Sequence, residues 1–167
     1  MRTKTLLGFF EKMPERAKEL IFEYNDINII EDISFYTYYC ESPIELILTT
    51  SIEIYKAINE DSLYYEPQTE VIINNKKYIV DFMIFSDKYV NTDLPENFKL
   101  IIECDGFEFH HSNKKQVEYD NKREYDFKMA GYQILRFTGT EIYKEPLECA
   151  KKIFDYLEKF RGKENDR

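Results

Sequence analysis

Two short apolar segments that carry acidic residues constrain the fold of this chain most strongly. YIVDFMIF at 78–85 and KLIIEC at 99–104 are rich in β-branched and aromatic residues, which favour strands. Side chains alternate along a strand, so Ile101, Glu103 and Asp105 share one face. A buried carboxylate is costly unless it is paired or binds a metal. The sequence therefore predicts a sheet in which these acids meet a positive partner.

The remaining segments predict helices on the faces of that sheet. Strands are expected at about 64–73, 77–85, 99–104 and 132–137, and helices at about 14–25, 42–59, 112–130 and 146–160. Asn74-Asn75 predicts a hairpin turn between the first two strands. A strand, a helix and another strand then follow in the order of a crossover connection. We expect an α/β fold with a mixed sheet of four to five strands.

Composition excludes several classes of protein. The chain of 167 residues fits a single domain over 1–167. Its 23 Lys and Arg against 32 Asp and Glu leave a net charge of −9, so contact with phosphates must be local or pass through a bound cation. The three cysteines lack zinc spacing, which favours reduced thiols in a cytoplasmic protein. No signal peptide or membrane span is expected.

Asp81 and Glu103 are the candidate centre of a site. Each interrupts or ends an apolar strand, and the two strands are expected to be neighbours. Oxygen ligands of this kind favour Mg²⁺ or Mn²⁺. The alternative is that each acid pairs with Arg136 or a lysine, or lies at an exposed strand end.

Two groups of polar residues follow these acids along the chain. His110 and His111 are the two histidines of the chain, and a histidine can act as a general base or simply lie on the surface. Gln116, Asp120 and Arg123 fall at i, i+4 and i+7 of the next helix. They would share one helical face, either beside the site or as an ordinary solvated Asp–Arg pair.

Glu45 has a sufficient local reason to be present. It is the fourth residue of Ser42-Pro43-Ile44-Glu45, which has the pattern of a capping box at a helix start. The same carboxylate could still project towards the other acids if this helix packs beside the sheet.

Six stretches in this order resemble the PD-(D/E)XK, or restriction-endonuclease-like, superfamily. The closest likeness is to small endonuclease-like domains related to very-short-patch-repair endonucleases. The stretches are SPIEL at 42–46, PQ at 67–68, YIVDF at 78–82, IIECDGFEFH at 101–110, QVEYDNKR at 116–123 and GYQILRF at 131–137. The resemblance implies an αβββαβ core at about 42–137, with extra helices at about 14–25 and 146–160.

The resemblance also implies roles for individual residues. Asp81 would be the central metal ligand, Glu103 the second acidic ligand, and the backbone carbonyl of Cys104 a further one. Glu45 would hold the metal through water, and His110 is the candidate base. The catalytic set implied in this way is Asp81, Glu103, Asp105, His110 and Gln116.

One position departs from the superfamily pattern. Asp105 stands where the pattern has a lysine. Lys114, Lys115 or Gln116 on the following helix would take its place. Asp120 and Arg123 would support the site, with Arg123 touching a phosphate oxygen if Asp120 does not hold it.

Together these features predict a nuclease that uses Mg²⁺ or Mn²⁺ to hydrolyse phosphodiester bonds, with DNA as the expected substrate. The alternatives are a catalytically inactive endonuclease-fold module that binds nucleic acid or a protein, and a metal-independent two-carboxylate hydrolase acting on sugars. The expected partner is nucleic acid and not a membrane. A homodimer or a larger DNA-processing assembly remains open.

Overall fold

The sheet has four strands in the order β1-β2-β3-β4. In this computed structural model, residues 11, 13–24, 30, 33–36, 38–106 and 114–162 are described, with 114–116 described by their backbone alone. The strands are β1 (Glu66–Ile73), β2 (Lys76–Phe85), β3 (Lys99–Asp105) and β4 (Gln133–Thr138). The first three run antiparallel, whereas β4 runs parallel to β3. The predicted α/β fold with a mixed sheet is confirmed.

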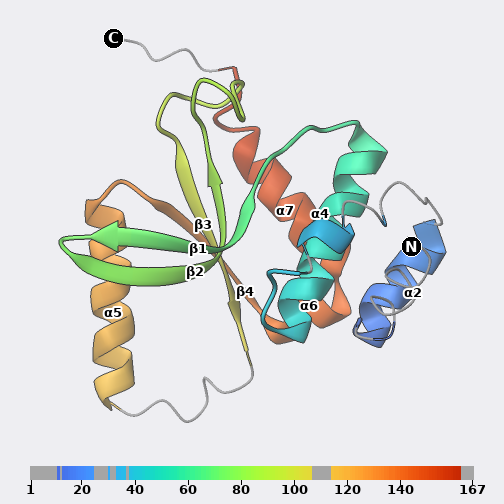
Figure 1. The fold of residues 1–167 in the computed structure, drawn as a ribbon, viewed down its shortest axis with the longest axis horizontal. Coiled ribbons are helices and arrows are strands. Elements are labelled where there is room, and N and C mark those ends of the chain that lie inside the picture. The colour runs from blue at the N-terminus through green and yellow to red at the C-terminus, as the bar shows by residue number, and fades with distance from the viewer. Residues whose placement is uncertain are drawn as a thin grey trace.

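The helices lie on both sides of the sheet, as Figure 1 shows. Helix α5 (Lys114–Met129) makes the crossover from β3 to β4 on one side. On the other side are α4 (Pro43–Asn59), α6 (Gly139–Lys144) and α7 (Pro146–Leu157), and α2 (Glu15–Tyr24) packs against α4. Among the described residues, no helix is long and apolar enough to span a membrane.

Local sequence signals set several of the boundaries. Ser42 caps α4 by accepting a hydrogen bond from the Glu45 N–H at 3.3 Å, and Pro43 occupies the first helical position. Asn74 and Asn75 have φ of 50° and 62°, the left-handed values that a tight hairpin turn requires. Gly131 follows α5 with φ of 82°, as a C-terminal cap does.

Helix α6 was not predicted from the sequence, although its signal is present. Thr138 and Glu141 form a complete capping box at its start, with reciprocal hydrogen bonds. Six residues are too few to show a helical period, which explains why the segment was missed.

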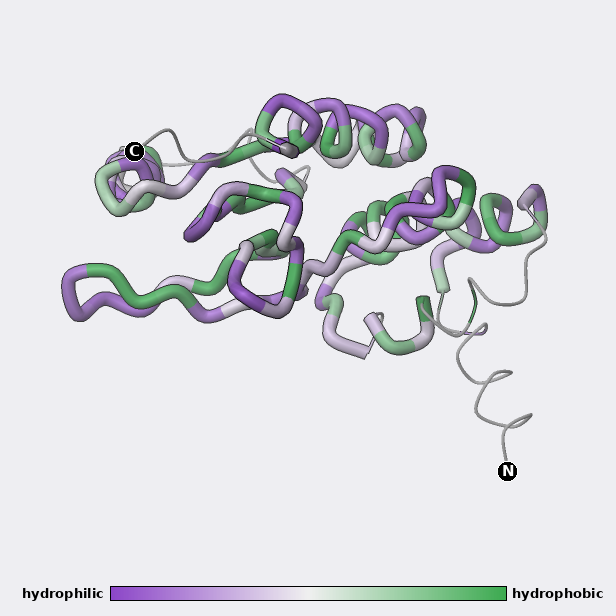
Figure 2. Tube along the Cα trace, turned by 90° about the horizontal axis from the view of Figure 1, so that it is seen from above, coloured by the Kyte–Doolittle hydropathy of each residue, from purple (hydrophilic) through white to green (hydrophobic). Residues whose placement is uncertain are grey.

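The core has two clusters, one on each side of the sheet. The larger joins α2, α4 and α7 to Phe82, Ile84, Leu100 and Ile102 of the sheet. The smaller joins Phe127 of α5 to Val71, Ile73, Tyr78, Val80 and Ile101. Along the helices the trace alternates between hydrophobic and hydrophilic residues, as expected of helices with one buried face (Figure 2).

The β1–β2 hairpin bends where it leaves the rest of the sheet. Val80 and Phe82 are two residues apart and should share a face, yet they pack in different clusters. The bend therefore falls at Asp81. The outer half of the hairpin covers α5, where the Tyr78 hydroxyl donates to Asp126 Oδ2 at 2.7 Å.

Candidate metal and catalytic site

The two acids at the predicted centre lie on neighbouring strands. Phe82 pairs with Ile102, so the next position of the same register places Asp81 opposite Glu103. Here a side chain links the two strands. Asp81 Oδ2 accepts a hydrogen bond from the Cys104 N–H at 2.6 Å. The bend in β2 and the end of β3 thus bring the predicted pair together.

Both acids resist ionisation in this position. Burial raises the pKa of Asp81 to about 6, and the Cys104 N–H only partly opposes this rise. Burial also raises the pKa of Glu103 to about 7, with Arg123 lowering it and the charge of Asp81 raising it. The charge of Asp81 therefore makes Glu103 more costly to ionise, and the charges of Glu45 and Asp105 do the same to Asp81.

Arg123 of α5 is a cation in direct contact with this pair. Its Nη2 donates to Glu103 Oε1 at 2.7 Å and to the Ile79 carbonyl at 2.8 Å, and its guanidinium lies over the Phe127 ring. The ion-pair alternative thus holds for Glu103, with Arg123 in place of the expected Arg136. Among the described residues, no lysine or arginine forms an ion pair with Asp81.

Glu45 is buried at the start of α4, with 4 % of its surface exposed. Its carboxylate accepts three hydrogen bonds, from the Ser42 hydroxyl at 2.6 Å and from the Glu41 N–H and the Gln68 amide at 2.9 Å each. The predicted capping box forms in altered form, because Glu45 bonds the N–H of Glu41 instead of that of Ser42. Glu45 also lies close enough to Asp81 for its charge to raise the pKa of that acid.

Asp105 lies half-buried at the end of β3. Burial raises its pKa, Arg136 and Arg123 lower it, and Asp120 raises it. This pattern places Asp120 of α5 near the acid that stands at the superfamily's lysine position. Charge effects thus link Glu45 and Asp105 to Asp81, and link Asp81, Asp105 and both arginines to Glu103.

Several predicted residues cannot be placed in the site. His110 and His111 lie outside the described residues. Lys114, Lys115 and Gln116 form the first turn of α5, but their side chains also lie outside the description. Their proposed roles stay predictions.

The donor set fits a hard divalent cation. Among the described residues, no three His, Cys, Asp or Glu side chains converge as a ready-made metal cage. Mg²⁺ seldom uses such a cage and is usually bound by one or two carboxylates together with substrate phosphates. Glu103 offers a buried carboxylate and Asp81 a half-buried one, on neighbouring strands.

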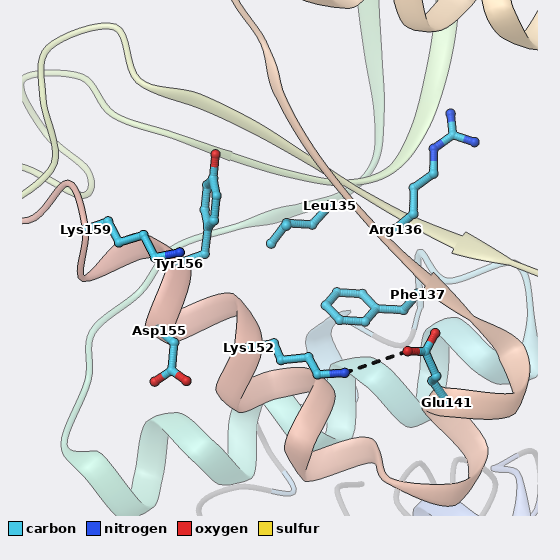
Figure 3. Close-up of a pocket in the computed structure, with 8 residues that line it drawn as sticks. All are labelled: Leu135, Arg136, Phe137, Glu141, Lys152, Asp155, Tyr156 and Lys159. Atoms are coloured by element: carbon cyan, nitrogen blue, oxygen red, sulfur yellow. Dashed lines mark ion pairs between the residues drawn. The ribbon is translucent and has the colours of Figure 1, made fainter.

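A pocket of about 380 Å³ lies elsewhere, between β4 and α7. Figure 3 shows Arg136 pointing away from the α7 side chains, while Lys152 forms an ion pair with Glu141 at 3.7 Å. Of the residues predicted for the site, none that the structure describes lines this pocket, whose lining is Leu135, Arg136, Phe137, Glu141, Lys152, Asp155, Tyr156 and Lys159.

A bent hairpin, a third strand, a crossover helix and a fourth strand, with acids where β2 meets β3, define a restriction-endonuclease-like protein. The family model REase_MTES_1575 matches residues 51–157, more than half of the chain. The chain belongs to this restriction-endonuclease-like family, which confirms the predicted superfamily. The likeness to very-short-patch-repair enzymes stays a prediction. No curated protein and no solved structure matches the chain.

The matched range contains the central acids and extends past the predicted core. It includes Asp81, Glu103 and Arg123, begins after Glu45, and continues to the end of α7. Sequence reasoning missed the part that Gln68 plays beside Glu45. The PQ stretch at 67–68 was its one signal in the sequence.

Proposed function

We propose that this protein is a divalent-metal-dependent nuclease that hydrolyses phosphodiester bonds in DNA. The observation that carries the proposal is that Asp81 and Glu103 each stand one residue beyond the Phe82–Ile102 pair of neighbouring strands, close enough for the charge of Asp81 to raise the pKa of Glu103. Membership of a restriction-endonuclease-like family supports a nuclease-type function in general. Metal dependence and DNA as the substrate are the finer parts of the proposal.

Each residue of the site has a distinct part. Asp81 and Glu103 would hold Mg²⁺ or Mn²⁺ together with the Cys104 carbonyl, and Glu45 would act through water. The bound ion would neutralise charge on the phosphate and lower the pKa of a water molecule. Asp81 is held in place by the Cys104 N–H, and Glu103 by Arg123.

The proton acceptor would come from the segment between β3 and α5 or from the first turn of α5. His110 is the candidate base, and Lys114, Lys115 or Gln116 would orient the water. Asp105 occupies the position of the usual lysine, so one of these residues must supply its function.

The charge of the chain predicts how DNA binding depends on conditions. Residues 106–137 carry six Lys and Arg against five Asp and Glu, a net charge of +1, whereas the rest of the chain carries −10. DNA should therefore bind weakly beside α5, only with a divalent cation, and should dissociate readily as salt is raised.

The test is cleavage of supercoiled, linear and single-stranded DNA, and of RNA, with Mg²⁺ or Mn²⁺ and with EDTA. Asp81→Asn and Glu103→Gln should each abolish cleavage. Asp155→Asn, which removes an exposed acid of α7, should leave it unchanged. Full activity in the first two variants would remove the assignment.

An inactive binding module is the second candidate, favoured by Asp105 at the lysine position and by the Arg123 ion pair to Glu103. Titration calorimetry with Mn²⁺ separates the two candidates. A competent site should bind Mn²⁺ stoichiometrically, and Asp81→Asn should abolish this binding. A module without the site should bind none.

A further inference from the structure

Gln68 is the third of the eight residues of β1 and has a backbone that a strand does not normally adopt. Its φ is 48°, in the left-handed region that side-chain-bearing residues seldom occupy. The neighbouring positions are regular, because Pro67 pairs with Phe82 and Thr69 with Val80. The distortion is therefore confined to Gln68, at the register position opposite Asp81.

This distortion coincides with the bend of the hairpin. Asp81 marks the point at which β2 passes from the larger core cluster to the smaller one, and Gln68 marks the same point in β1. Residues held in sparsely populated backbone regions persist where the surrounding structure requires them, often at functional sites.

The side chain of Gln68 connects this bend to helix α4. Its Nε2 donates to Glu45 Oε2 at 2.9 Å, across 23 residues of sequence. Of the three donors to the Glu45 carboxylate, Gln68 alone comes from the sheet, since Ser42 and Glu41 are its own chain neighbours. Within the described residues, Gln68 makes no other side-chain hydrogen bond.

We propose that Gln68 is a positioning residue of the metal site. Its hydrogen bond holds the Glu45 carboxylate beside β1, at the place where β1 faces Asp81. The inference rests on the proposed function, because it assigns Glu45 to the bound cation. Partners that orient the groups around a metal are worth about 10–100-fold in metal affinity.

The test compares variants that keep the left-handed backbone but lose the contact with Glu45. Glycine adopts this φ freely, and asparagine tolerates it but is one methylene too short to keep the same contact. Asn75→Gly is the matched control, since Asn75 also has a left-handed φ of 62° but is exposed at the hairpin turn. Each variant is measured by Mn²⁺ calorimetry, by electron paramagnetic resonance of bound Mn²⁺, and by urea unfolding.

We expect Gln68→Gly and Gln68→Asn to bind Mn²⁺ about 10–100-fold more weakly. The resonance spectrum at saturation should change, while the urea midpoint stays near that of the natural chain. Asn75→Gly should change none of these. If Gln68→Gly keeps the Mn²⁺ affinity and the resonance spectrum of the natural chain, this inference is overturned but the proposed function is not. So would an affinity loss that merely follows a lowered urea midpoint. If the natural chain binds no Mn²⁺, the proposed function fails as well.

Discussion

Replacing Asp81 by asparagine should stabilise the metal-free protein at high pH. The folded state holds the Asp81 pKa at about 6, above its ordinary 3.8, so between these values it binds more protons than the unfolded state. By linkage, stability falls as pH rises through this window. The rise corresponds to about 3 kcal/mol once Asp81 is ionised in both states. An asparagine avoids this cost and keeps an oxygen acceptor for the Cys104 N–H.

This cost already includes the favourable hydrogen bond that the ionised carboxylate accepts from the Cys104 N–H, because that bond lowers the Asp81 pKa. We therefore expect Asp81→Asn to be more stable than the natural chain by about 3 kcal/mol at pH 8 and no more stable at pH 4. Urea unfolding in EDTA at five or six pH values between 4 and 8 measures the difference. A variant equally or less stable at pH 8 would refute the reasoning.

Magnesium should reverse the order of stability. A ligand at 1,000 times its dissociation constant stabilises the folded state by about 4.1 kcal/mol, and only the natural chain should gain this. Asp87→Asn is the control, because the pKa of Asp87 is shifted in the opposite direction from that of Asp81. The N–H groups of Tyr89 and Val90 lower the pKa of this exposed acid. Its ionised form is favoured by folding, so neutralising it should not stabilise the protein at pH 8, with or without Mg²⁺.

Three further substitutions test the framework around the site by urea unfolding. Ser42→Ala removes the cap of α4 and should cost about 1 kcal/mol, whereas Ser42→Thr should retain most of the stability. Arg161→Ala leaves Asp61 without its bidentate partner and should cost about 1–3 kcal/mol; a cost near zero would show that the pair is solvated. Gly139→Ala should stay within about 0.5 kcal/mol, since a Cβ would meet the Asp105 carbonyl at 3.5 Å, an ordinary contact. A large loss there would contradict the packing.

The elements of the fold could be predicted because their signals are local. The Ser42-Pro43 start of α4, the Asn74-Asn75 turn and the Gly131 cap each act on torsions within a few residues. The apolar runs of β2 and β3 are similarly evident, and the acids within them identified the strand positions that matter. Helix α6 was not predicted because its one sequence signal is a capping box.

The sequence by itself determined which residues are acidic within apolar strands, and therefore which strands must meet around a positive group. Only the tertiary structure decided that Glu103 pairs with Arg123, 20 residues away, and that Gln68 reaches Glu45. The physical reason is that alternating apolar residues predict which side chains share a face only where the strand is straight. The bend at Asp81 depends on tertiary packing, because Val80 packs against α5 on one side of the sheet and Phe82 packs with α2, α4 and α7 on the other. No local signal at Asp81 encodes that packing.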